Sequence, residues 1–434
     1  MSTRLASGWF ARACATFAAL TSSGSLWAAD SGFIDGTKAN LNLRNFYFNR
    51  NFVDPAYTAQ NKAEEWTQSF IFGLTSGYTQ GPVGFGIDAL GLYSVKLDGG
   101  AGTYGTQLLP THAGNEPAKD FGRLALAAKA KVSKTDIKVG EWFAVLPILR
   151  SDDGRSLPQT FQGAQIHSAE IQNLELWGGQ MRQNSPRNDA SMQDMFMQGR
   201  ANATSDRFNF VGGEYKFNEK RTQIGLWYAQ LEDIYHQKFI NLIHYQPVGS
   251  WTLGANLGYF IGEDDGSARA GALDNRTAYA LLSAKQGGGT FYVGLQRVSG
   301  DSPWMRVNGT SGGALGNDSY NSSYDNARER SWQVRYDYNF AAFGMPGLTL
   351  MKPLPERRQR THRHHHRWQG MGTRVRGAIR GAERSAEEAV DPLAQLDHET
   401  RLQRQRLLRR EPHYPQLPHL GVVRRGLSGC LGGR

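Results

Sequence analysis

The chain has 434 residues, a formal net charge of +10, a mean hydropathy of −0.52 and only two cysteines. No apolar run approaches the roughly 18 residues of a membrane-spanning helix, so a membrane protein with this sequence must cross the bilayer with β-strands. Cys14 and Cys430 lie close to opposite ends of the chain, which excludes a disulfide framework and argues against cysteine ligands for a metal.

The net positive charge comes entirely from the last part of the chain. Residues 351–434 hold 18 Lys+Arg and 8 Asp+Glu, whereas residues 1–350 hold 31 of each and are neutral. The aromatic residues divide at the same place, because only Trp368 and Tyr414 of the 48 Phe, Trp and Tyr lie beyond it. Two different kinds of sequence therefore meet near Met351.

Residues 1–29 have the features of an export signal. Two arginines precede a short apolar stretch over residues 13–20, and two alanines stand directly before Asp30. This order of basic, apolar and small residues is typical of a secretory signal peptide. We expect export to the periplasm and a mature chain that begins near residue 30.

The segment from Trp66 to Asp98 carries the clearest pattern, two stretches of alternating residues joined at Gln80-Gly81-Pro82. In each stretch the apolar side chains fall on one face of a strand and mostly Thr, Ser, Gly or charged residues on the other. Strands in soluble sandwiches have a modal length of roughly 5–6 residues, whereas about 9–11 tilted residues cross a bilayer. The pattern predicts part of the wall of an outer-membrane barrel, with lipid on one face and water on the other.

The same alternation recurs along the chain and predicts an all-β fold, a transmembrane antiparallel β-barrel. Short turns alternate with longer loops, as in outer-membrane barrels. A fifteenth strand begins at residues 347–351 and then stops. Fourteen strands are predicted near residues 39–50, 66–79, 83–97, 121–132, 136–143, 160–171, 174–182, 208–217, 221–231, 238–246, 251–261, 276–285, 290–298 and 331–342.

Five motifs occur in order between about residue 30 and residue 351. They are Leu43-Arg44-Asn45-Phe46-Tyr47-Phe48-Asn49-Arg50, Gly77-Tyr78-Thr79-Gln80-Gly81-Pro82-Val83-Gly84-Phe85-Gly86-Ile87-Asp88-Ala89, Leu157-Pro158-Gln159-Thr160, Leu231-Glu232-Asp233-Ile234-Tyr235 and Ser331-Trp332-Gln333. Together they resemble the OprD family of substrate-specific outer-membrane porins. The resemblance implies an 18-stranded monomeric barrel that is narrowed by inward-folded loops and passes small carboxylate-bearing solutes without energy input. In the best-known members these solutes are basic amino acids and carbapenem antibiotics.

The resemblance also implies a place in the cell and a set of partners. We expect the outer membrane of a Gram-negative bacterium, contact with its lipid and lipopolysaccharide, and the barrel-assembly machinery during insertion. We expect no enzymatic activity, catalytic residue, cofactor or metal, and no nucleic-acid partner.

Arg50 and Arg155 match positions that the family gives to a row of arginines in the lumen. Such a row suits a carboxylate, because each guanidinium offers a planar bidentate site and can pass the anion to the next. Arg123, Lys129 and Lys131 fall on the polar face of their predicted strand and would extend the row. The alternative interpretation is that these are ordinary solvated charges of a barrel.

Residues 317–319 and 322–325 resemble the loop that lines the family's constriction opposite the arginines. Its hydroxyl groups and carboxylates would hold a substrate's amino group while the arginines hold its carboxylate, a transverse arrangement that selects solutes. The predicted lining residues are Asp318, Ser319, Ser323, Tyr324 and Asp325.

Four other motifs suggest different chemistry. Residues 309–313 fit a nucleophile elbow, but they lie in a Gly/Asn/Ser-rich loop without the strand–turn–helix context that a hydrolase needs. Residues 263–265 would suit a hard cation or, more simply, a solvated loop. The histidines of residues 362–366 would suit a transition metal. The Arg-rich tail would suit nucleic acid, although it lacks interleaved aromatics and an identifiable module.

The tail from about residue 352 has the composition of a GC-rich gene read in the wrong frame. It is rich in Arg, lacks Phe, and begins inside a predicted strand, where no domain boundary is expected. We therefore expect residues 30–351 to form an incomplete barrel and residues 352–434 to be no native domain. Transport would then be defective in the chain as it stands. A structural or adhesive barrel with a plugged lumen is the alternative function.

Overall fold

A computed structural model describes residues 32–52, 60–319, 322–345, 348–359 and 374–376. The chain divides into two compact units, residues 1–382 and 383–434, and all described residues belong to the first. The predicted signal and most of the Arg-rich tail lie outside the described residues. Among the described residues, no helix has the length and apolar character needed to cross a membrane.

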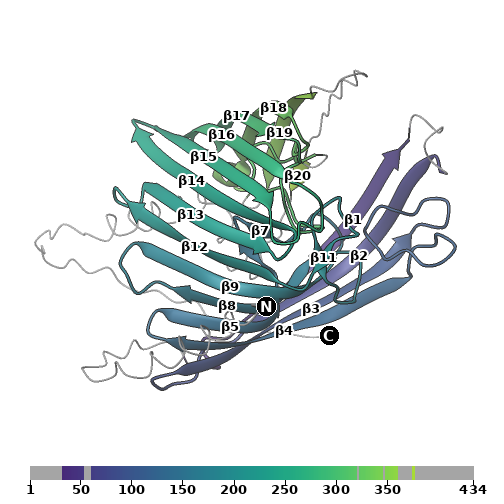
Figure 1. The fold of residues 1–434 in the computed structure, drawn as a ribbon, viewed down its shortest axis with the longest axis horizontal. Helices are drawn as coiled ribbons and strands as arrows, with labels where there is room; N and C mark the ends of the chain where they lie inside the picture. Colours follow the sequence, from purple (N-terminus) through teal and green to yellow (C-terminus); the bar gives the residue numbers. More distant parts are fainter. Residues whose placement is uncertain (1–31, 53–59, 320–321, 346–347, 360–373, 377–434) are drawn as a thin grey trace, which may run out of the picture. The chain divides into compact units, whose positions relative to one another are not determined.

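One antiparallel sheet dominates the first unit (Figure 1). Two small hairpins lie in its loops, β6 (Val145–Leu146) with β7 (Leu149–Arg150) and β10 (Met195–Phe196) with β11 (Thr204–Ser205). A short 3₁₀ helix, η3 (Phe340–Phe343), follows strand β18 (Glu329–Asn339). The sheet has sixteen strands, in the order β1 (Lys38–Asn51), β2 (Lys62–Thr75), β3 (Gly84–Asp98), β4 (Asp120–Val132), β5 (Thr135–Trp142), β8 (Thr160–Ser168), β9 (Leu174–Ser185), β12 (Phe208–Phe217), β13 (Thr222–Leu231), β14 (Tyr235–Val248), β15 (Trp251–Asp264), β16 (Asp274–Gln286), β17 (Gly289–Ser299), β18 (Glu329–Asn339), β19 (Thr349–Gln359) and β20 (Arg374–Arg376).

All fourteen predicted strands are present, and the all-β antiparallel fold is confirmed. The largest displacement is that of β2, which ends at Thr75 and not near residue 79. The polar groups after Thr75 have other partners. The hydroxyl of Ser76 accepts from the amide of Ile87 at 2.8 Å, and the amide of Gly77 donates to the carbonyl of Phe33 at 3.0 Å. These bonds replace the strand ladder with an irregular turn.

The prediction that the fifteenth strand stops near Met351 is wrong. β19 continues to Gln359 and pairs with β18 from Thr349↔Asn339 to Gln359↔Glu329. Among the described residues, β20 pairs with just the first three residues of β19. Within the described residues, most of β19 is unpaired on the side away from β18. Prolines are tolerated in such a strand, because the amide hydrogen that proline lacks is not needed for a ladder bond on the open side. Within the described residues, β1 and β20 are the two edges of the sheet.

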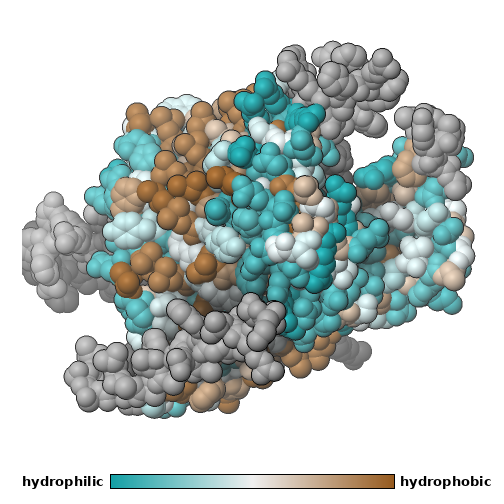
Figure 2. Space-filling view, viewed as in Figure 1, coloured by the Kyte–Doolittle hydropathy of each residue, from teal (hydrophilic) through white to brown (hydrophobic). Residues whose placement is uncertain are grey.

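Side-chain alternation gives the sheet two different faces. On β2, Phe70 and Phe72 are exposed on one face, while Thr67 and Ser69 are fully buried on the other. Figure 2 shows apolar side chains gathered on the exposed face over β13–β16. Its exposed apolar residues include Leu41, Leu43, Phe85, Ile87, Leu124, Leu126, Val139, Val211, Leu226, Ile240, Leu253, Val293 and Leu295. We call this the outer face; the predicted alternation, with apolar side chains on one face of each strand, is therefore confirmed.

The hydrophobic core lies on the opposite, inner face, where long loops pack against the strands. Leu146, Met195 and Met305 come from three different loops and share one buried cluster with the inner side chains of β8, β9 and β12–β16. Within it the rings of Phe239 and Phe260 stack with centroids 3.9 Å apart. Burial of these apolar groups holds the loops inside the sheet.

Candidate functional site

Three long loops meet on the inner face and form one packed unit. We call residues 143–159 loop A, residues 186–207 loop B and residues 300–328 loop C. The amide of Ser311 donates to the carbonyl of Arg150 at 2.9 Å, which joins C to A. C joins B through short backbone bonds around Met197 and Val307, and A joins B through an ion pair between Arg187 and Asp152 of 2.6 Å.

Glutamine side chains of two strands hold the backbone of loop C. The amide nitrogen of Gln296 on β17 donates to the carbonyls of Ser323 and Tyr324 at 3.0 and 2.8 Å. Gln333 on β18 donates to the carbonyl of Gly316 at 2.7 Å. Both glutamines are almost fully buried. Tyr324, itself buried, has a left-handed φ of 51°. Loop C is therefore positioned by the barrel wall and not only by its own contacts.

The two predicted arginines Arg50 and Arg155 lie beside the same aromatic ring. Their guanidinium carbons are 5.3 and 4.9 Å from the centre of Phe48, within the range of a cation–π contact. Arg155 also donates to the carbonyls of Thr106, at 2.9 Å, and Gly154, at 2.8 Å. The structure thus brings together the two arginines that the sequence singled out, Arg50 exposed and Arg155 partly buried.

Arg44 belongs to the same group of cations, and the sequence analysis missed it. Its guanidinium binds both carboxylate oxygens of Asp153, at 2.7 and 3.0 Å, and donates to the carbonyl of Arg155 at 2.7 Å. Arg44 shares its strand face with Phe48 and Arg50, since the three are separated by even numbers of residues. That parity was the signal that would have found it.

Further arginines of the loops were also missed by the sequence analysis. Arg306 pairs with Asp325, with Nε 3.1 Å from Oδ2. Burial lowers the pKa of Arg150, and the nearby charge of Asp318 opposes that shift. Arg187 pairs with Asp152, as described above. No strand periodicity covers these segments, so no face could be assigned to these arginines from the sequence.

The acidic and hydroxyl residues predicted in loop C form a small network. The hydroxyl of Ser323 donates to Asp318 at 2.8 Å. Burial raises the pKa of Asp318 to about 6, while the Ser323 hydrogen bond and the Arg306 charge act in the opposite direction. Ser319 differs, because its amide and hydroxyl close a local turn onto the carbonyl of Ser322, at 3.0 and 3.1 Å. Asp318, Ser323 and Asp325 therefore lie beside the arginines of loops A and C.

Arg123 anchors loops. Its guanidinium donates to the carbonyls of Pro186 and Asp189, at 3.1 and 2.7 Å, and to that of Pro158. Its Nε lies 3.8 Å from Glu141, and only 6% of its side chain is exposed. Its donors are thus committed to the backbone of loops A and B.

Lys129 and Lys131 lie at the other end of β4, next to the short turns. The ammonium of Lys129 is 2.7 Å from Asp88 and 2.7 Å from the carbonyl of Ser76. The ammonium of Lys131 lies 5.4 Å from the centre of the Tyr78 ring. The structure therefore places these two lysines apart from the arginines of the three loops.

The motifs that suggested a cation site or a nucleophile elbow lie in ordinary loop hydrogen bonding. Among the described residues, no group of His, Cys, Asp and Glu side chains is arranged to hold a metal. Asp265 accepts instead from the side chain of Gln230, at 2.9 and 3.0 Å, and from the amide of Asp233 at 3.1 Å. Ser311, the serine of the elbow-like motif, accepts from the amide of Gly313 within loop C. The histidines of residues 362–366 lie outside the described residues.

Comparison with known proteins decides the family. The family model described as "outer membrane porin, OprD family" matches residues 31–358. The chain belongs to the OprD family of outer-membrane porins. Members of this family are channels of the Gram-negative outer membrane, which confirms the predicted family, class and location.

Individual relatives agree with this assignment. The porin-like protein GalP of Pseudomonas putida is 66% identical over 333 residues, which cover 77% of this chain and 81% of the relative. A BenF-like porin from Pseudomonas fluorescens is 68% identical, with a TM-score of 0.74 and 76% and 85% of the two chains covered. OccK2 of Pseudomonas aeruginosa, solved in complex with glucuronate, is 58% identical, with a TM-score of 0.69 and 77% and 83% covered.

Proposed function

We propose that this porin, with its wall completed, is a passive diffusion channel for small carboxylate-bearing solutes. The observation that carries the proposal is the proximity of three arginines on the inner face. Arg50 and Arg155 of loop A lie over the same aromatic ring, and Arg44 donates to the carbonyl of Arg155. Guanidinium groups bind carboxylates in a bidentate geometry and cost less to desolvate than ammonium groups. The glucuronate bound to OccK2 is itself a sugar carboxylate, which supports the same class of solute here.

In this proposal the network of loop C forms the side of the site opposite these arginines. Asp325 and Asp318 offer carboxylate oxygens, and Ser323 offers a hydroxyl, to the amino or hydroxyl groups of a solute. A solute that carries both a carboxylate and such groups would be held across the pore, between arginines and loop C. Amino acids, hydroxylated organic acids and carbapenem antibiotics have this character.

Conductance and solute flux test the proposal. The frame-restored protein in planar bilayers should give discrete open-channel currents, and liposomes that contain it should swell faster with small organic acids than with neutral sugars of equal size. Absence of any open-channel current would support the alternative, a structural or adhesive barrel with a plugged lumen. Equal swelling rates for acids and neutral sugars would reject the carboxylate preference alone.

We also infer that residues from about 352 are read in the wrong frame, so that the chain as it stands is a defective porin. The family match ends at residue 358, and the excess positive charge and the loss of aromatics begin at the same place. Translation of the coding DNA beyond codon 351 in the other two frames tests this. A frame that yields alternating strands ending in an apolar residue is expected; its absence from both frames would overturn the inference.

A further inference from the structure

Two arginines on the outer face stand directly opposite each other. Arg297 on β17 and Arg330 on β18 are register partners, and both are exposed. Directly opposed side chains on one sheet face have Cβ atoms roughly 4.5–5.5 Å apart, at which like charges repel. Arg276 on β16 lies on the same face, diagonal to Arg297, because its own register partner is Ser299. These three arginines form what we call the arginine patch.

The patch lies at the edge of the apolar surface. One step further along the same two strands, Leu295 and Trp332 are register partners, 55% and 42% exposed. Beyond them come the pairs Val293↔Val334 and Phe291↔Tyr336. The ring centroids of the second pair are 4.6 Å apart. A tryptophan at the end of an aliphatic band marks the boundary between hydrocarbon and headgroups. The patch therefore lies at headgroup depth.

The position of the patch along β17 and β18 identifies the membrane leaflet that it faces. Arg297 and Arg330 flank loop C, one of the long loops. In outer-membrane barrels the long loops are extracellular and the short turns periplasmic. The patch thus faces the outer leaflet.

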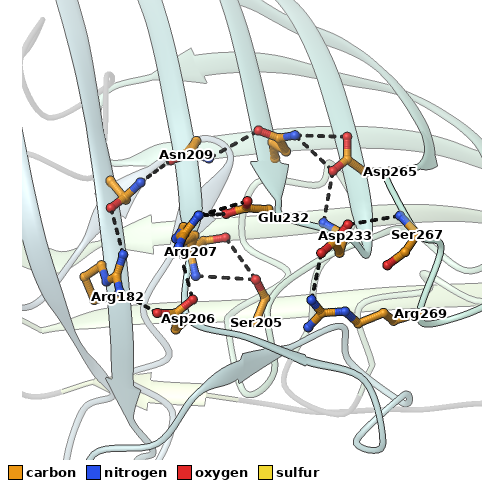
Figure 3. Close-up of polar contacts among 12 residues, drawn as sticks. Arg182, Ser205, Asp206, Arg207, Asn209, Glu232, Asp233, Asp265, Ser267 and Arg269 are labelled. Atoms are coloured by element: carbon orange, nitrogen blue, oxygen red, sulfur yellow. Dashed lines mark hydrogen bonds and ion pairs between the residues drawn. The ribbon is translucent and has the colours of Figure 1, made fainter. Parts of the chain in front are cut away.

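Three other exposed arginines of the long-loop rim have acidic partners, as Figure 3 shows. Arg182 is paired with Asp206, Arg207 with Glu232 at 3.0 Å and Arg269 with Asp233 at 2.7 Å. Among the side chains that the structure describes, Arg297 and Arg330 make no such pair. Arg276 approaches Asp274 only at 3.8 Å. Arg297 and Arg330 are therefore available to bind an external anion, unlike these three paired arginines.

We propose that the arginine patch binds the phosphate groups of lipid A, the membrane anchor of lipopolysaccharide. A phosphate seated between Arg297 and Arg330 would remove their mutual repulsion and accept bidentate bonds from both guanidiniums. The acyl chains would then lie along the exposed apolar column beneath. Basic residues near a bilayer surface recognise anionic headgroups in this way. The proposal concerns the outer wall and does not depend on which solute the lumen passes.

Lipid binding by detergent-refolded protein tests the proposal. The full 434-residue chain and its frame-restored form are titrated with bisphosphoryl lipid A, with monophosphoryl lipid A and with phosphatidylglycerol, and binding is followed by native mass spectrometry. Each arginine of the patch that is replaced by alanine should weaken binding of bisphosphoryl lipid A about fivefold. The double variant Arg297→Ala/Arg330→Ala should therefore bind about 25-fold more weakly.

Arg182→Ala is the matched control, because it removes the same charge from the same rim but from an arginine that already has an acidic partner. It should bind lipid A as the parent does. Retained strand content by circular dichroism checks that each variant still folds. Unchanged binding by the double variant, an equal loss in the control, equally tight phosphatidylglycerol binding, or no saturable binding by either parent form would each overturn the proposal.

Discussion

Arg44 on β1 binds both carboxylate oxygens of Asp153 in loop A, although the two residues are 109 positions apart in the chain. The same guanidinium donates to the carbonyl of Arg155, so one strand residue fixes the loop segment that carries a candidate binding arginine. The position of Arg155 on the inner face is therefore set by a residue of the barrel wall.

Replacement of Asp153 by asparagine should loosen this part of loop A without unfolding the protein. The neutral amide loses the charge of the pair, which is partly exposed, so the loss is roughly 1 kcal/mol or less. We expect more frequent current fluctuations in single-channel records of the frame-restored protein. Glu64→Gln is the control, because it neutralises another ion-paired carboxylate far from loop A in sequence. Fluctuations equal to those of the parent would contradict this role of Arg44.

Replacement of Arg155 by alanine should weaken uptake of anionic solutes. A charge-assisted hydrogen bond contributes about 1.5–3 kcal/mol, so the half-saturating concentration of a carboxylate solute should rise roughly tenfold or more. Arg155→Lys should recover part of the loss, because lysine keeps the charge but not the bidentate geometry. Arg182→Ala, which removes an ion-paired arginine from the outer rim, should leave flux unchanged. Equal flux and anion preference in Arg155→Ala and the parent would remove Arg155 from the site.

Asp318 should make ion selectivity depend on pH. Burial raises its pKa from 3.8 to about 6, so the folded protein binds this proton more readily than the unfolded chain does. The stability that this group contributes is fully present below about pH 4 and is lost as pH rises towards 6. Between pH 7 and pH 5 the carboxylate is neutralised beside Arg150 and Arg306, so the local field becomes more positive.

Reversal potentials in a salt gradient measure this effect. The frame-restored channel should become more anion-selective at pH 5 than at pH 7. Asp318→Asn should be anion-selective at both values and lose the difference between them. The control Asp301→Asn changes an exposed carboxylate of loop C that is paired with Arg328, and it should keep the pH dependence. If the change in ion selectivity between pH 7 and pH 5 has the same size in Asp318→Asn as in the parent, the titrating group is not Asp318.

The sequence predicted the wall well because one physical rule governs it. On β2, the need to place Phe70 and Phe72 on one face and Thr67 and Ser69 on the other fixes both strand and orientation. The same parity placed Arg123 on the inner face, as its loop contacts require. Strand parity did not reveal that the Arg123 guanidinium donates its hydrogen bonds to loop carbonyls, because these contacts depend on where loops A and B fold.

The arginines of the loops could not be predicted from strand parity. Arg150, Arg187 and Arg306 lie in segments without a repeating pattern, and their partners come from distant parts of the chain. Motif resemblance located Asp318 and Asp325 but could not separate them from Ser319, which closes a local turn. Only tertiary contacts make that distinction.

The edges of the sheet lead to the last prediction, that the chain as it stands does not form a closed, membrane-stable barrel. Within the described residues β1 pairs only with β2, and at the other end β20 pairs with only three residues of β19. Each unpaired backbone group in hydrocarbon costs several kcal/mol, and roughly 9–11 residues cross the bilayer at each edge. This cost exceeds a typical net stability of about 5–15 kcal/mol.

Outer-membrane fractions of cells that express the 434-residue chain should therefore contain no heat-modifiable, protease-resistant band, and such cells should behave as porin-deficient. The frame-restored gene should produce that band, because its additional strands would pair the open edges. Lipid-facing arginines cannot substitute for them, since arginine at the bilayer midplane costs about 2–4 kcal/mol. A heat-modifiable band from the unrestored gene would show that the wall closes by a pairing that the described residues do not include.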